Sequence, residues 1–158
     1  MSDAVNVMLM INGEQQALCV PPFETLLTSL RDRLGLTAAK RGCNQGVCGA
    51  CSVLVEGRPA RACLSLTANC VDQEITTVEG LSAPLELSPL QEAMVRAGAI
   101  QCGFCTPGML ISLTALLREC PRPTRDDIRA AISSNICRCT GYQKIVEAVA
   151  DMIAPSAQ

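Results

Sequence analysis

Eleven cysteines and no histidine set the strongest limit on what this chain of 158 residues can form. Histidine is the commonest general base and the commonest neutral metal ligand, so its absence leaves any metal chemistry to thiolates. An odd number of cysteines also argues against a scaffold in which every thiol is paired in a disulfide. The sequence therefore predicts a protein whose chemistry depends on thiolate-bound metal.

The composition excludes several classes of function. Charged residues make up 18% of the chain and the formal net charge is -2, which leaves no basic surface for a nucleic acid. Aromatic residues make up only 2%, so surfaces on which bases or sugars could stack are scarce. No apolar run approaches the roughly 20 residues that span a bilayer.

The N-terminal stretch MSDAVNVMLMINGEQQ lacks the basic and apolar regions of a signal peptide. We therefore expect a cytoplasmic protein with reduced thiols, although the signal of a partner could still direct its export.

The first 79 residues have the pattern of a small α+β unit with two hairpins, one helix and a final short strand. Asn12-Gly13 is a strong signal for the first hairpin turn, and residues 57–59 are the expected turn of the second. The helix should begin at Thr25 and end at Gly35. The expected strands are 5–11, 16–20, 52–56, 61–66 and 75–78.

The pattern changes to helical after an expected linker at residues 80–87. Ser88-Pro89-Leu90-Gln91 is a capping box with proline at the first helical position, and three further helix starts follow. These starts are Thr106-Pro107, Thr124-x-x-Asp127 and Thr140-x-x-Gln143. The predicted fold is α+β, with one domain at residues 1–79 and a four-helix domain at residues 88–158.

One group of four cysteines lies in the first half of the chain, in a loop predicted at residues 38–50 and just after it. Its C-x4-C-x2-C spacing is that of plant-type [2Fe–2S] proteins, whereas zinc sites prefer pairs separated by two to four residues. Three glycines in the loop would let the backbone approach inorganic sulfides and direct N–H groups at them. The predicted ligands are Cys43, Cys48, Cys51 and Cys63, and the glycines are Gly42, Gly46 and Gly49.

The second group consists of Cys102-x2-Cys105 and Cys137-x-Cys139. Each pair lies just before an expected helix, where the positive end of the helix dipole favours thiolates. The spacing alone fits iron and zinc equally well. The C-x2-C could also be a redox dithiol, but no thioredoxin-like βαβ pattern surrounds it. The remaining cysteines, which we interpret as small buried side chains or surface thiols, are Cys19, Cys70 and Cys120.

Three stretches together resemble the iron–sulfur subunit of the molybdenum hydroxylases, the family of xanthine dehydrogenase, aldehyde oxidoreductase and carbon monoxide dehydrogenase. They are GCNQGVCGAC at residues 42–51, QCGFCTPG at residues 101–108 and NICRCTGY at residues 135–142. The resemblance covers nearly the whole chain. It implies a ferredoxin-like (β-grasp) domain followed by a four-helix domain, each holding one [2Fe–2S] cluster.

The resemblance also implies partners. The second cluster would lie beside a molybdenum–pterin cofactor on a large subunit, and Gln101 and Cys139 match positions that contact the pterin. Gln101 could instead simply cap a helix. The first cluster would face an FAD-binding medium subunit or another acceptor such as a cytochrome.

The implied function is a one-electron relay within a multi-subunit oxidoreductase. No residue of this chain is a convincing nucleophile or general base, so we expect no catalytic centre here, and the partner would select the substrate. The alternatives are a zinc-stabilised interaction module without enzymatic function and a free-standing ferredoxin-like carrier.

Overall fold

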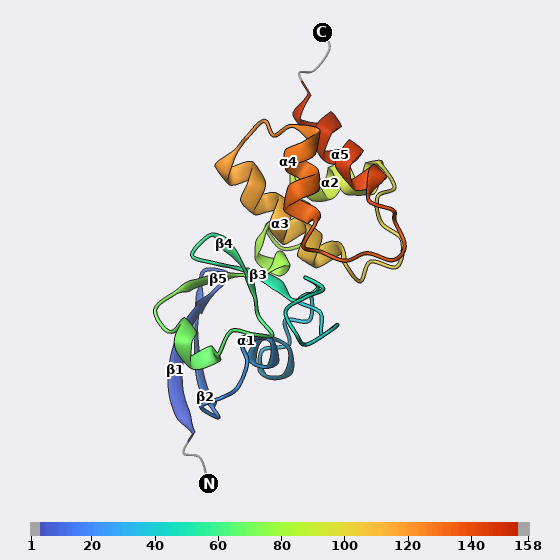
Figure 1. The fold of residues 1–158 in the computed structure, drawn as a ribbon. Helices are drawn as coiled ribbons and strands as arrows, with labels where there is room; N and C mark the ends of the chain where they lie inside the picture. Colours follow the sequence, from blue (N-terminus) through green and yellow to red (C-terminus); the bar gives the residue numbers. More distant parts are fainter. Residues whose placement is uncertain (1–3, 155–158) are drawn as a thin grey trace.

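The computed structural model describes residues 4–154, which form a sheet domain followed by a helical domain (Figure 1). The five strands have the order β2-β1-β5-β3-β4, and all neighbours are antiparallel except β1 and β5. This arrangement confirms the predicted α+β fold. The strands are β1 (Val5–Ile11), β2 (Glu14–Val20), β3 (Ser52–Val55), β4 (Arg58–Arg61) and β5 (Glu74–Thr76).

The first hairpin has the predicted turn, whereas the second turns earlier than predicted. Asn12 and Gly13 have φ values of 53° and 81°, as expected for a two-residue hairpin turn. In the second hairpin the same role belongs to Glu56 and Gly57, with φ values of 50° and 74°. The prediction of a turn at 57–59 with a return strand at 61–66 is therefore wrong, because Arg58 already pairs with Val55. The last strand is also shorter than predicted, since a 3₁₀ turn, η3, occupies Val78–Gly80.

The helix predicted from Thr25 is present but consists of two forms. Thr25 caps a single α-turn, α1 (Leu26–Thr28), which continues as the π-helical segment η1 (Ser29–Arg33) before Gly35. Ser29 faces inward together with the leucines, and its hydroxyl bonds to Thr67 at 2.8 Å. A 3₁₀ turn, η2 (Thr67–Cys70), lies between β4 and β5.

Four helices form the second domain, and the capping boxes at Ser88 and Thr124 are both present as predicted. The helix start predicted at Thr140 is wrong. Tyr142, at φ 65°, is the N-cap residue of the last helix, and the Thr140 hydroxyl donates to Cys137 Sγ instead. The helices are α2 (Pro89–Arg96), α3 (Thr106–Glu119), α4 (Arg125–Ile132) and α5 (Gln143–Ile153).

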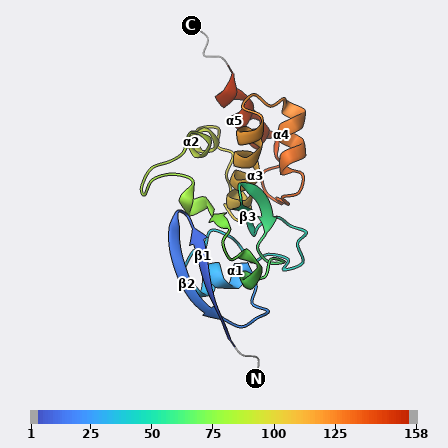
Figure 2. The same cartoon turned by 90° about the vertical axis from the view of Figure 1, so that its left-hand side faces the viewer.

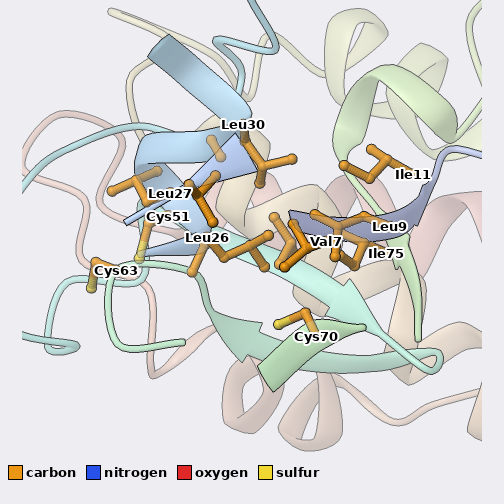
Figure 3. Close-up of a cluster of buried hydrophobic side chains, with 14 residues drawn as sticks. Val7, Leu9, Ile11, Leu26, Leu27, Leu30, Cys51, Cys63, Cys70 and Ile75 are labelled. Carbon is orange, nitrogen blue, oxygen red and sulfur yellow. The ribbon is translucent and has the colours of Figure 1, made fainter. Parts of the chain in front are cut away.

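Each domain has its own hydrophobic core. In the first, Leu26, Leu27 and Leu30 pack against the inward residues of β1 and β5 (Figure 3). A separate core fills the space between α2, α3, α4 and α5. Leu54 of β3 packs with Ile111 and Ala115 of α3, and both views show α3 lying beside β3 (Figures 1 and 2). The two domains therefore share an apolar contact in addition to their own cores.

Within residues 4–154, none of the helices combines the length and the apolar character needed to cross a bilayer.

Candidate metal centres

Glycines shape the first cysteine loop because side chains there would collide with their surroundings. A Cβ on Gly42 would lie 2.9 Å from Cys48 Sγ, and one on Gly46 would lie 2.3 Å from Leu64. Gly46 and Gly49 also have φ values of 76° and 73°, which other L-residues rarely adopt. The loop can therefore wind closely around its own thiols only with glycine at these positions.

Backbone N–H groups point at the thiols of this loop. The N–H groups of Gln45 and Cys48 each lie 3.4 Å from Cys43 Sγ, and the N–H of Cys43 lies 3.4 Å from Cys48 Sγ. The Cys48 and Gln45 N–H groups lower the pKa of Cys43 to about 6. Cys43 is thus readily available as a thiolate, which is the form that binds metal.

The other two cysteines of the first group lie at the base of the second hairpin. Cys51 precedes β3 and Cys63 follows β4, and both are buried at the same end of the first core (Figure 3). Burial, together with the adjacent Cys63 thiol, raises the pKa of Cys51 to about 11. A positive metal centre would offset this unfavourable burial of thiolates.

The second group joins the loop before α3 to the loop before α5. Cys139 Sγ lies 3.6 Å from Cys102 Sγ, and both residues are exposed. Cys105, the N-cap residue of α3, is buried and in contact with Cys137, and burial raises its pKa to about 12. Burial also raises the pKa of Cys137, but hydrogen bonds, chiefly from the hydroxyl and N–H of Thr140, outweigh this effect and lower it to about 7.

The eight thiols meet as four pairs. The pairs are Cys43 with Cys48, Cys51 with Cys63, Cys102 with Cys139 and Cys105 with Cys137. A [2Fe–2S] cluster takes two protein ligands on each of two irons, whereas a zinc site needs four ligands around one ion. Within residues 4–154, no three Cys, Asp or Glu side chains converge on a position for a single metal ion. The pairwise arrangement of the donors fits two binuclear iron–sulfur clusters.

A buried contact between the two domains was missed by the sequence analysis. The side-chain amide of Asn135 donates to the Gly49 carbonyl at 3.0 Å, and the Ile136 N–H donates to the Cys48 carbonyl at 2.9 Å. A Cβ on Gly108 would lie only 2.3 Å from the Gly49 oxygen. Gly108 and Asn135 both lie within the motifs at residues 101–108 and 135–142, but no local pattern indicates that they meet residue 49. We call this contact the domain seam.

The three remaining cysteines lie apart from both groups. Cys70 is buried in the first core, where its thiol contacts the Leu66 carbonyl, and burial raises its pKa. Cys19 is exposed on β2, and Cys120 follows α3.

We expect Cys19→Ala, Cys70→Ala and Cys120→Ala each to retain the iron content of the unmodified protein, because none of these thiols contacts either group. Cys70→Ala should lower the free energy of unfolding by about 1 kcal/mol, since it removes one buried heavy atom from the core. Iron analysis and urea denaturation of the three variants check this prediction. Loss of half of the iron in any one of them would contradict it.

Two family models match the chain. A "2Fe-2S iron-sulfur cluster binding domain" matches residues 25–97, and a "[2Fe-2S] binding domain" matches residues 77–150. Together they cover both cysteine groups, so the chain carries [2Fe–2S] binding domains in both halves.

Relatives and solved structures agree with these models. The nicotine 6-hydroxylase small subunit of Paenarthrobacter nicotinovorans is 50% identical, over 95% of this chain and 90% of that protein. The nicotinate dehydrogenase small FeS subunit of Eubacterium barkeri is 43% identical, over 92% of each. The crystal structure of quinoline 2-oxidoreductase from Pseudomonas putida 86 contains a chain that is 44% identical, with a TM-score of 0.92 over 96% of this chain and 94% of that one. The chain belongs to the iron–sulfur small subunits of the molybdenum hydroxylase family of multi-subunit oxidoreductases.

Proposed function

We propose that this chain is an electron-transfer subunit with two [2Fe–2S] clusters that relays single electrons from a molybdenum–pterin hydroxylase subunit to a flavin subunit or another acceptor. The observation that carries the proposal is the pairwise meeting of eight thiols at two sites in a chain of this family. When bound, each cluster supplies a centre that accepts and releases one electron at a time. The chain itself would contribute the ligands, the packing around them and the separation between the two sites.

The proposed ligands are the four cysteines of each group. Cys43, Cys48, Cys51 and Cys63 would hold the first cluster, and Cys102, Cys105, Cys137 and Cys139 the second. N–H groups of Gln45 and Thr140 already point at thiols of the two sites, at 3.4 Å in each case. Such donors stabilise anionic centres in surroundings that exclude water. The glycines at 42, 46 and 49 would keep the backbone of the first loop close enough to the cluster for its N–H groups to make these contacts.

The second site is proposed to face the large subunit. Gln101 is exposed directly before Cys102, and the exposed Cys139 lies beside Cys102, so a pterin could reach both proposed contacts from one side. Capping does not explain Gln101, because the N-cap residue of α3 is Cys105. Exposed apolar side chains at Ile100, Phe104 and Ile136 fit a surface covered by a partner.

The first site is proposed to be the outer one. Val47 in its loop and Leu64 beside the loop are each 62% exposed, which fits a second contact surface for an FAD-binding subunit or a cytochrome.

We further propose a cytoplasmic location for the protein. We also propose that its domains span residues 1–79 and 88–158, with a linker at residues 80–87.

The test is metal analysis and EPR spectroscopy of the purified protein. We expect about four iron and about four acid-labile sulfide per chain, the sum of two [2Fe–2S] centres. Reduction should give two distinguishable S = 1/2 signals, because one site lies in a sheet domain and the other between helices. A colourless protein with stoichiometric zinc and no sulfide would support the interaction module and overturn the relay.

A further inference from the structure

Arg61, at the end of β4, reaches three oxygen atoms from three different segments. Its guanidinium donates to the Gly46 carbonyl of the first cysteine loop at 3.3 Å and to the Ser134 carbonyl of the helical domain at 2.8 Å. It also donates to the Ser52 hydroxyl at the start of β3. The planar fork of five N–H donors makes arginine suited to holding several acceptors at once.

The acceptors of Arg61 belong to one connected network at the domain seam. The Ser52 hydroxyl donates to the Gly49 carbonyl at 2.7 Å, and the same carbonyl accepts from the Asn135 amide. Asn135 is 1% exposed, and its side-chain Oδ1 accepts from the Ser112 hydroxyl at 2.7 Å. Such buried networks hold their members in one arrangement because every broken link leaves an unpaired polar group.

The positive charge of Arg61 is not cancelled by a nearby carboxylate. No Asp or Glu in residues 4–154 forms an ion pair with it, whereas Arg33, Arg41 and Arg129 each have an acidic partner. Arg61 lies two residues before Cys63 and is half-buried, and it pairs across the hairpin with Ser52, which follows Cys51. A cation in this position stabilises additional negative charge at the first site.

We propose that Arg61 is a positioning residue that fastens the first cysteine loop to the helical domain, and that its charge favours the reduced form of the centre bound in that loop. The proposal rests on the function proposed above. Arg61 would therefore help to fix the spacing between the two sites, and its charge would account for part of the difference between their reduction potentials.

The test compares Arg61→Gln and Arg61→Lys with Arg58→Gln in the complete holoprotein. Arg58 lies on the same strand and is exposed, so its substitution matches the loss of charge without touching the seam. EPR-monitored redox titration measures the potential of each centre separately. Hydrogen exchange measures protection of residues 134–136, where the Ile136 N–H reports on the seam.

Arg61→Gln should shift the redox equilibrium of the first centre about tenfold toward the oxidised form, equal to about 59 mV for one electron, with the second centre unchanged. Arg61→Lys should keep the redox equilibrium of the first centre within about threefold of that in the unmodified protein, because it keeps the charge. Both variants should exchange at least about tenfold faster at residues 134–136, since a single terminal nitrogen replaces the three guanidinium nitrogens that hold the three acceptors. Arg58→Gln should leave both measurements unchanged.

An unchanged first potential in Arg61→Gln, or an equal shift of both centres, would overturn the role of the charge. Unchanged exchange in Arg61→Lys would overturn the positioning role, and this measurement decides the matter if Arg61→Gln does not retain its first centre. Absence of iron and sulfide from the unmodified protein would instead refute the relay function itself, so the two failures are distinguishable.

Discussion

Cys48→Ala is expected to remove about half of the iron and half of the acid-labile sulfide, and Cys137→Ala the other half. Each substitution deletes one of four thiolates at its own site, and three ligands leave one iron of the cluster incompletely bound. The loss should be confined to one site because each domain has its own core. Iron and sulfide analysis should therefore be paired with EPR spectra, which should show one of the two reduced signals missing in each variant.

The first of these variants, Cys48→Ala, also tests the proposed order of the sites. In a complex assembled with its large subunit, Cys48→Ala should still allow substrate to reduce the remaining centre, while transfer to the acceptor stops. Rapid mixing followed by EPR should show that signal appear and persist. If dithionite reduces the remaining centre but substrate does not, the order of the two sites is the reverse of the one proposed.

The [2Fe–2S] binding domains could be predicted from the sequence because most of their cysteines lie in short, closely spaced motifs. The glycines between Cys43 and Cys51 and the capping boxes at Ser88 and Thr124 act over a few residues, so the sequence reveals them directly. Predictions failed where two local signals competed. In the second hairpin, Gly57-Arg58-Pro59 has the composition of a turn, but positive φ at Glu56 and Gly57 places the turn one residue earlier.

Sequence patterns did not indicate several contacts of the structure, both local ones and ones between distant segments. The Thr140 hydroxyl donates to Cys137 Sγ and accepts from the N–H of Tyr142, the N-cap residue, so Thr140 is not itself the N-cap, and nothing in T-x-x-Q reveals this. Likewise, Asn135 bonds to Gly49 across 86 positions of sequence, which no periodicity encodes. The sequence therefore predicted each cysteine group separately, whereas the domain seam that sets their mutual position emerged only in three dimensions.

The strongest test of the domain seam is Gly108→Ala, which we expect to destabilise the protein although it improves helix propensity. In an isolated helix, alanine is favoured over glycine by about 1 kcal/mol. Here a Cβ would lie 2.3 Å from the Gly49 carbonyl oxygen and 2.8 Å from the Asn135 amide. Both belong to the seam, and the carbonyl is backbone of the first cysteine loop, so it cannot simply rotate away.

We expect the overlap to outweigh the propensity gain and to lower the free energy of unfolding by about 1–3 kcal/mol. Thr114→Ala is the matched control, since it improves helix propensity in α3 at a half-buried position away from Gly49. Denaturant unfolding measures the stability of both variants, and hydrogen exchange at Ile136 reports whether the seam has opened. Equal stability of Gly108→Ala and Thr114→Ala, with Ile136 still protected, would show that the backbone yields at little cost. In that event the close approach of α3 to the first cysteine loop would not be what fixes the two sites relative to each other.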